Sequence, residues 1–136
     1  VLDIDFFKKI NDSYGHDIGD FVLKECVRLL KDSFHREQDM VARIGGEEFA
    51  IVVPQYKVED AVKKVEELMA RIRKEVFIQG ELQISFTASM GIAQLMENET
   101  HDQWLKRADS ALYQSKNTGR NKYTVAPQLK KVGNVA

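Results

Sequence analysis

The sequence predicts an α+β domain, and three observations support this. Short apolar runs that alternate with polar residues indicate strands, whereas longer segments with apolar residues every three or four positions indicate helices. Two of the apolar runs flank Gly45-Gly46, which is typical of a β-hairpin. The order strand, helices, hairpin, helix, strand, helix favours an α+β sandwich, in which we expect the helices to cover one face of the sheet.

The first third of the chain predicts one strand and two helices. Residues 1–6 alternate, so that Leu2, Ile4 and Phe6 face a core while Asp3 and Asp5 share the opposite face. Residues 7–13 form a short helical turn, which Tyr14-Gly15 ends. Residues 20–35 form a helix whose apolar stripe includes Cys26. That position makes the single cysteine a core residue rather than a reactive thiol.

The remaining two thirds predict a hairpin, two helices and two strands. Residues 40–44 and 49–53 are the two strands of the hairpin, and Pro54 closes it. A helix spans residues 58–75, a strand residues 84–95 and a second helix residues 102–117, with Gly119 as its C-terminal cap. A short strand over residues 123–125 is the last predicted element.

Composition limits the classes of function. The 136 residues, of which 43% are hydrophobic, suit a single domain with one core. The formal net charge of −1 and the lack of a basic stripe disfavour a nucleic-acid-binding surface. The sequence has no signal peptide or apolar run of membrane-spanning length, so we expect no membrane contact by this domain. Because the chain starts inside a strand without methionine, we expect it to be an excised piece of a longer protein.

Acidic residues gather at two points. Asp3 and Asp5 form an alternating pair in an apolar strand, and Glu47 and Glu48 follow the two glycines of the hairpin. Glycine lets a ligand approach the backbone closely. If Asp3 and Glu47 meet across neighbouring strands, they supply the hard oxygen ligands that magnesium prefers. The alternative for the glycine pair alone is a tight turn with solvated acids.

Four ordered motifs carry a resemblance over almost the whole chain. They are Asp3-x-Asp5-x-Phe7-Lys8-x-x-Asn11-Asp12, Gly15-His16-x-x-Gly19-Asp20, Arg43-x-Gly45-Gly46-Glu47-Glu48-Phe49, and Ala108-Asp109-x-Ala111-Leu112-Tyr113-x-x-Lys116-x-x-Gly119-Arg120-Asn121. Together they resemble the GGDEF family of diguanylate cyclases, which condense two GTP into cyclic di-GMP. The resemblance implies a single catalytic domain over residues 1–136, truncated at its N-terminus. It also implies a palm-like, ferredoxin-related nucleotide cyclase fold with a central, mostly antiparallel sheet flanked by helices.

The resemblance implies a set of catalytic and metal-binding residues. Asp3, the backbone carbonyl of Ile4, and Glu47 would hold Mg²⁺, with Mn²⁺ as the alternative ion. Glu47 is also implied as the proton acceptor from the attacking 3′-hydroxyl, although a metal-bound carboxylate is a poorer base. Glu48 would support a second metal or the local charge, and Lys8 would stabilise charge on the transferring phosphate.

The resemblance also implies how GTP is bound. Asn11 and Asp20, with His16 nearby, would read the base, and Gly46 would let the nucleotide approach the hairpin. A carboxylate accepts from both N1–H and the amine of guanine, whereas adenine lacks both donors on that edge. Lys116 and Arg120 would bind the phosphates; their alternative is to act as counter-charges to the dipole of the last helix.

An inhibitory product site is implied by Arg36 and Asp39, which precede the hairpin at the family's Arg-x-x-Asp spacing. The alternative is an ordinary helix-to-strand loop. Glu67 stands where some family members have a second inhibitory arginine, and the family's Asp-x-Leu-Thr-Gly-Leu-x-Asn-Arg turn upstream is absent from this sequence.

The resulting prediction is a cytoplasmic diguanylate cyclase domain that acts as a homodimer under an upstream sensor domain, through which the full-length protein could be tethered to a membrane. GTP is the expected substrate, and cyclic di-GMP the expected product and inhibitor. The main alternative is a non-catalytic domain that binds GTP or cyclic di-GMP to regulate a partner; the intact glycine–acid turn counts against it. A different nucleotidyl transferase with a palm-like core is the third reading.

Overall fold

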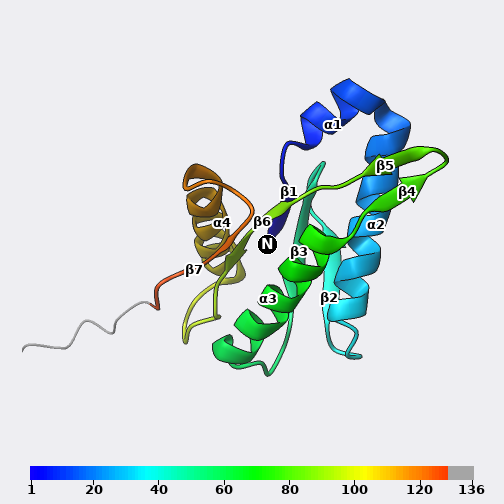
Figure 1. The fold of residues 1–136 in the computed structure, drawn as a ribbon. Coiled ribbons are helices and arrows are strands. Elements are labelled where there is room, and N and C mark those ends of the chain that lie inside the picture. Colours follow the sequence, from blue (N-terminus) through cyan, green and yellow to red (C-terminus); the bar gives the residue numbers. More distant parts are fainter. Residues whose placement is uncertain (129–136) are drawn as a thin grey trace, which may run out of the picture.

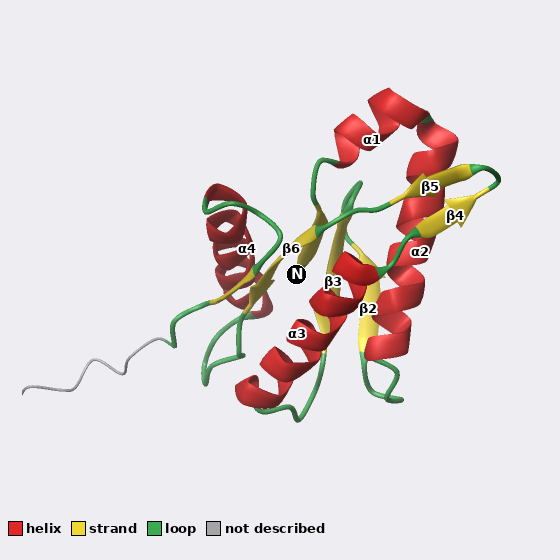
Figure 2. Cartoon of the chain, viewed as in Figure 1, coloured by secondary structure: helices red, strands yellow, loops and turns green. Residues whose placement is uncertain are grey.

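The computed structural model describes residues 1–128 and contains a five-stranded sheet with helices on both faces (Figures 1 and 2). In chain order the elements are β1 (Leu2–Ile4), α1 (Phe7–Tyr14), α2 (His16–Ser33), β2 (Met40–Arg43), β3 (Glu48–Val52), α3 (Val58–Lys74), β4 (Phe77–Gln79), β5 (Leu82–Ile84), β6 (Ala88–Ile92), α4 (His101–Asn117) and β7 (Tyr123–Val125).

The strand order in the main sheet is β2-β3-β1-β6-β7, which places β1 at the centre. β1 pairs antiparallel with both β3 and β6, and β2 pairs antiparallel with β3; only β6 and β7 run parallel. The expectation of a central, mostly antiparallel sheet flanked by helices is therefore confirmed. In this register, Asp3 lies opposite Glu48 on one side and Ser89 on the other.

The sequence predicted that the helices would cover one face of the sheet. In the structure they cover both faces. Leu2, Ile4 and Met90 belong to the main core, together with buried residues of α2 and α3. Because side chains alternate along a strand, Gly91 faces the other way. A Cβ atom on Gly91 would lie 2.1 Å from the backbone oxygen of Ala108 in α4. The missing side chain of Gly91 thus lets α4 pack directly on the second face, which Figure 1 shows opposite α2 and α3.

Most predicted elements form close to their expected bounds, but β1 ends at Ile4, and Phe6, which the sequence predicted to face the core, has φ 56° and is 60% exposed. The hairpin pairs Arg43 with Phe49, α3 ends one residue early, and β7 spans the predicted residues. The last helix begins at His101, one residue earlier than expected, because Thr100 caps it. The Thr100 hydroxyl accepts from the backbone N–H of Gln103, and the Gln103 side chain accepts from that of Thr100.

The second helix begins at His16, four residues earlier than predicted. Gly15 has φ 91° and donates its N–H to the carbonyl of Asn11, so it ends α1. The N–H of Gly19 then already bonds back to the carbonyl of Gly15. A single glycine in an unusual conformation therefore separates two consecutive helices, and no loop is needed between them.

The strand predicted over residues 84–95 is wrong in extent. Ile84 ends β5, which pairs with β4 in a separate hairpin that the sequence did not predict, and residues 88–92 alone form β6. The carbonyl of Ala93 accepts from the Trp104 indole at 2.7 Å, and that of Gln94 accepts from the Arg107 side chain. Side chains of α4 thus take over the backbone acceptors where the strand was expected to continue.

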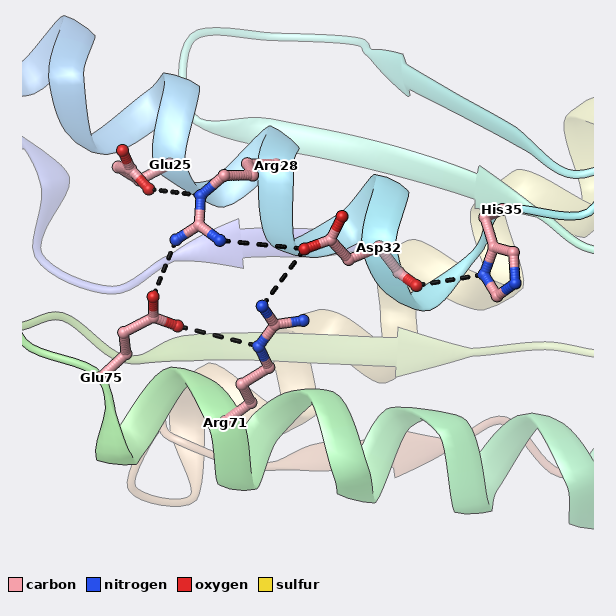
Figure 3. A network of polar contacts seen from close by, with 6 residues as sticks. All are labelled: Glu25, Arg28, Asp32, His35, Arg71 and Glu75. Carbon is pink, nitrogen blue, oxygen red and sulfur yellow. Dashed lines mark hydrogen bonds and ion pairs between the residues drawn. The ribbon is translucent and has the colours of Figure 1, made fainter.

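A network of ion pairs joins α2 to α3 on the surface (Figure 3). Arg28 contacts Glu25 and Glu75, each at 2.7 Å, and Arg71 contacts Asp32 at 3.2 Å. Because Arg28 and Arg71 are each 43% exposed, water and salt screen these pairs and their contribution to stability is small. No helix within residues 1–128 is long and apolar enough to cross a membrane.

Candidate functional site

A pocket of about 340 Å³ lies between α1, α2 and the β2–β3 turn. It brings together six of the residues that the sequence predicted to act on a nucleotide. Its lining residues are Phe7, Lys8, Asn11, His16, Asp20, Leu23, Arg43, Gly46 and Glu47. The proposed base-reading residues, on α1 and α2, thus share one cavity with Glu47 of the hairpin, which comes later in the sequence.

The side chain of Asn11 is the most informative feature of this pocket. Its Oδ1 atom is buried and has no hydrogen-bond partner among residues 1–128. A buried acceptor without a partner costs free energy, so this atom is an exception among the buried polar groups of residues 1–128. Gly19 creates the space, because a Cβ atom there would lie 1.8 Å from Asn11 Oδ1. His16 and Asp20 lie exposed on α2 beside it.

The turn of the hairpin is held by Arg43. Its Nε donates to the carbonyl oxygens of Gly45 at 3.2 Å and Gly46 at 2.9 Å. A Cβ atom on Gly46 would meet no heavy atom within 4 Å, so the space beside this residue is open to a ligand. The sequence motif contained Arg43, but its spacing gave no indication that the arginine orients the glycine carbonyls.

Asp3 lies on β1, and Glu47 lies in the turn directly before the neighbouring strand β3. The N–H of Ile4 donates to the backbone oxygen of Glu47 at 3.2 Å, which places the end of β1 beside the turn. Asp3 is only 6% exposed, and its Oδ2 accepts from Lys116 Nζ at 2.7 Å. Lys116 of α4 therefore neutralises the charge of a buried carboxylate in the centre of the sheet.

Glu48 points toward α4 rather than into the pocket. It lies opposite Asp3 in the sheet and next to Asp109. Burial raises the pKa of Glu48, and the Asp109 carboxyl and the charge of Asp3 raise it further, while Lys116 acts in the opposite direction. The acids Asp3, Glu48 and Asp109 thus concentrate negative charge on the α4 face of β1 and β3.

This donor set is compatible with magnesium. Asp3 and Glu47 provide carboxylates and Ile4 a carbonyl, which are hard oxygen ligands. Within residues 1–128, no three His, Cys, Asp or Glu side chains lie close enough together to enclose a metal ion. An ion held by two carboxylates and one carbonyl would complete its shell with water and phosphate oxygens, which is the usual arrangement for Mg²⁺ at nucleotides.

The sequence predicted that Asp3 and Asp5 would form a carboxylate site on one face of the first strand. In the structure Asp5 does not form such a site with Asp3. It is 2% exposed, and its two oxygens accept hydrogen bonds from Thr87, Ser89 and the N–H of Asn121. These donors satisfy the carboxylate within the chain. Its role is therefore in holding the backbone near Asn121.

Arg120 lies outside the lining of the pocket, close to Asp5. Its Nη1 is 4.0 Å from Asp5 Oδ1, and its guanidinium stands 4.9 Å from the centre of the Phe6 ring. Lys116 is likewise engaged by Asp3 and does not line the pocket. The two predicted phosphate-binding cations thus lie next to Asp3 and Asp5.

Arg36 and Asp39 meet, but they close on each other. Asp39 accepts from Arg36 Nε at 2.9 Å and Nη2 at 2.7 Å, and Arg36 also stacks on Tyr56 with 4.1 Å to the ring centre. Burial acts to raise the pKa of Asp39, but the hydrogen bonds from Arg36 prevail and hold it below its usual value. Glu67 is exposed on α3. The geometry stabilises the loop whether or not a ligand binds there.

A second hollow of about 370 Å³ lies alongside the first, between α2 and β2. Its lining is Leu23, Lys24, Val27, Lys31, Val41, Arg43 and Phe49. None of these residues offers a carboxylate or amide acceptor, so this hollow lacks the groups that read a guanine base. The smaller pocket is therefore the candidate site.

Comparison of the sequence with known proteins points in one direction. A family model described as "Diguanylate cyclase, GGDEF domain" matches residues 1–122. Over 124 residues the chain is 41% identical to the response regulator PleD of Caulobacter vibrioides, covering 89% of this chain and 27% of PleD. It is 42% identical over 126 residues to the diguanylate cyclase DgcM of Escherichia coli K12, covering 93% of this chain and 30% of DgcM. The chain thus spans less than a third of the length of these two relatives.

Solved structures give the same result. The GGDEF domain of DgcB from Caulobacter crescentus, in complex with c-di-GMP, superposes with a TM-score of 0.87 at 33% identity, over 92% of this chain and 74% of that one. The diguanylate cyclase SiaD from Pseudomonas aeruginosa, in complex with its activator SiaC, gives a TM-score of 0.86 at 41% identity, over 92% of this chain and 48% of SiaD.

Proposed function

The chain belongs to the GGDEF family of diguanylate cyclase domains, and on this premise we propose that it synthesises cyclic di-GMP from two molecules of GTP with release of pyrophosphate. One observation carries the proposal. Asn11, whose Oδ1 is buried and has no partner among residues 1–128, lines the same pocket as Asp20 and Glu47. The proposed base-reading residues and a proposed metal-binding carboxylate would therefore share one cavity.

Guanine is the base that this pocket suits. The Asp20 carboxylate accepts hydrogen bonds from N1–H and the exocyclic amine of guanine, and Asn11 Oδ1 offers a further acceptor. Adenine would leave the acceptors of Asp20 unpaired, which is a strong basis for rejection. His16 stands at the rim of the same pocket.

The phosphates would lie between the hairpin and the cations around it. Lys8 comes from α1, whereas Lys116 and Arg120 come from the end of α4 and the turn that follows. Phosphoryl transfer requires charge neutralisation and in-line placement of the reacting groups. Lys8 would neutralise charge on the transferring phosphate, and Lys116 and Arg120 charge on the other phosphates.

Asp3, the carbonyl of Ile4, and Glu47 would hold Mg²⁺, with Mn²⁺ as the alternative ion. When bound, the ion neutralises phosphate charge and orients the triphosphate. Glu48 and Asp109 add negative charge beside this site, and Lys116 balances it. Open space at Gly46 leaves room for the triphosphate against the turn.

The reaction requires two copies of the domain. Within residues 1–128 the proposed base-reading residues line a single pocket, whereas the product contains two guanosines joined through two equivalent phosphodiester bonds. A two-fold pairing of half-sites satisfies this stoichiometry. The 3′-oxygen of one GTP attacks the α-phosphorus of the other, the bond from that phosphorus to the bridging oxygen breaks, and pyrophosphate leaves. Glu47 would accept the proton of the 3′-hydroxyl.

We also propose that an upstream sensor domain controls the pairing of the two copies, and that cyclic di-GMP binds at Arg36 and Asp39 as an inhibitor. Relatives several times longer than this chain support the first point. The cytoplasm is the expected location, because GTP and magnesium are available there.

The test is to incubate the full-length protein with GTP and Mg²⁺ and to identify the product by mass spectrometry. The expected result is cyclic di-GMP with two pyrophosphates per product molecule, and none from ATP. Glu47→Gln should abolish the product without unfolding the domain, because a neutral amide is a weaker magnesium ligand. GTP that binds to the wild type but remains unchanged would instead indicate a non-catalytic regulatory domain.

A further inference from the structure

We propose that Asp5 is a positioning residue: its buried carboxylate fixes the turn at Arg120 and Asn121 and so sets where the Arg120 guanidinium stands. This inference rests on the phosphate-binding role that the proposed function gives to Arg120. It assigns to Asp5 a function that does not involve a metal ion, although the sequence motif places it beside Asp3.

The contacts of Asp5 come from two distant parts of the chain. Its Oδ1 accepts from Ser89 Oγ at 2.6 Å, and its Oδ2 accepts from Thr87 Oγ1 at 2.7 Å. These hydroxyls fix the carboxylate against β6 and the residues before it. The same Oδ2 accepts from the backbone N–H of Asn121 at 2.9 Å. A side chain just after β1 is therefore bonded to the backbone that follows α4.

The backbone that Asp5 holds is strained. Arg120 has φ 61° and Asn121 φ 50°, so two consecutive residues with side chains adopt the left-handed region. This conformation is unfavourable outside glycine, although asparagine tolerates it better than most residues, and it persists only when surrounding contacts fix it. Besides Asp5, Arg73 holds the turn through the side chain and the carbonyl of Asn121, at 2.8 and 2.9 Å.

The Asp5 carboxylate also lies near the side chain of Arg120. Arg120 Nη1 is 4.0 Å from Asp5 Oδ1, and the guanidinium stands over the ring of Phe6. The Asp5 side chain is fully buried, whereas the Arg120 side chain is 35% exposed. One part of the guanidinium is thus oriented from within, by an acid and an aromatic ring, while another part is free to meet a ligand.

This arrangement has a consequence for the reaction. Asp3 and Asp5 are two residues apart, so β1 and the turn after it would set both a metal ligand and a phosphate-binding arginine. Loss of the Asp5 charge should leave the fold largely in place but let the turn relax. The position of the Arg120 guanidinium, and with it the affinity for triphosphate, should then change.

The experiment is a double-mutant cycle in the full-length protein. The variants are Asp5→Asn, Arg120→Ala and the double variant. The ligand is a GTP analogue with a methylene group in place of the α,β-bridging oxygen, which blocks turnover, and its Kd is measured by calorimetry with Mg²⁺. Arg120→Ala should raise Kd about tenfold. Asp5→Asn should raise it about threefold or more in the wild-type background, and less than about twofold when Arg120 is already alanine.

A second readout does not depend on nucleotide. Hydrogen exchange at the Asn121 amide should be faster in Asp5→Asn, because the amide replaces the charged acceptor of that N–H. Glu99→Gln is the matched control, because it also neutralises a buried carboxylate near α4. The Glu99 side chain is 3% exposed and pairs with Arg107. This control should lower stability without changing Kd or Asn121 exchange. If Asp5→Asn does not fold, Thr87→Val is the substitute, because it removes the hydrogen bond from Thr87 to Asp5 Oδ2. It should raise Kd and speed Asn121 exchange by smaller amounts.

The possible failures can be told apart. If Arg120→Ala raises Kd and the effect of Asp5→Asn persists in full beside it, the positioning role is wrong while the role of Arg120 stands. Unchanged Asn121 exchange in Asp5→Asn also overturns the inference. If Arg120→Ala leaves Kd unchanged, the proposed phosphate contact is wrong and the inference that rests on it falls as well.

Discussion

Asn11 and Gly19 fit together so closely that a methyl group on Gly19 would lie 1.8 Å from the Oδ1 atom of Asn11. The two residues come from successive helices, α1 and α2, and the oxygen has no partner among residues 1–128. The absence of a side chain at Gly19 thus leaves the space that the Asn11 amide occupies.

Gly19→Ala should raise the Kd for GTP about tenfold. The new methyl group displaces the end of a flexible side chain rather than backbone, so the melting temperature should change little while Asn11 leaves the pocket. Asn11→Ala is the control and should cost a similar factor, and the double variant should be no worse than either single one. Calorimetry showing wild-type affinity in Gly19→Ala would remove Asn11 from the recognition of the base.

Asp20→Ser should weaken discrimination between GTP and ATP by about tenfold or more. The carboxylate accepts from two guanine donors, whereas adenine leaves it unpaired, so its removal hurts GTP binding and relieves the penalty on ATP. Competition binding with both nucleotides measures the ratio. A preference equal to that of the wild type would mean that Asp20 does not read the base.

Arg36→Ala should weaken binding of cyclic di-GMP and relieve product inhibition without lowering the initial rate. The structure adds an expected loss of stability, because Arg36 also holds Asp39 and donates to the carbonyl of Pro54 at 2.7 Å. Arg36→Lys separates the two effects, since it keeps the charge but loses the forked geometry. Equal affinity for cyclic di-GMP in wild type and Arg36→Ala would leave this segment as a structural loop only.

Stability should depend on pH through Glu99 and Arg107. The hydrogen bonds from Arg107 hold the pKa of Glu99 below its usual value, against the effect of burial. Because the folded-state pKa is the lower one, the stabilisation is complete above the unfolded-state pKa and is lost as pH falls through the folded-state pKa. Arg107→Met should therefore destabilise the protein at pH 7, and its difference from wild type should shrink below about pH 4.

Thermal or urea unfolding of wild type and variant between pH 3 and pH 7 provides this comparison. Arg28→Met is the control, because Arg28 is 43% exposed in its pair with Glu75 and should contribute only ~0–1 kcal/mol. A difference between wild type and Arg107→Met that does not change with pH would show that Glu99 does not respond to Arg107 as described.

The sequence predicted the fold well where one local signal decided the structure. The hairpin at Gly45-Gly46 and the amphipathic helix from Val58 formed as expected, since turn chemistry and periodicity act over a few residues. The strand predicted over residues 84–95 was wrong in extent because Trp104 and Arg107 of α4 bond to the backbone where the strand ends. The periodicity of a short segment gives no information about such distant partners. The placement of α4 on the second face depended on Gly91, a residue that reads from sequence only as a weak point in a strand.

The candidate site was predicted as a list of residues rather than as an arrangement. The motifs indicated Asn11, Asp20 and Glu47, and the structure brings them into one pocket. Spacing could not separate Asp3 from Asp5, because alternation in a strand puts both on one face. Only the contacts with Thr87, Ser89 and Asn121 show that the second acid is occupied within the chain.

The most direct test of the central claim is the rate of cyclic di-GMP formation per chain as a function of protein concentration. It is measured for the full-length protein and for the same protein fused to a leucine zipper. Paired half-sites predict that the rate per chain rises with concentration in the unfused protein. In the zipper fusion the rate should be higher and nearly independent of concentration. Full, concentration-independent synthesis by a demonstrated monomer, or no synthesis by the fused dimer with GTP and Mg²⁺, would contradict the account.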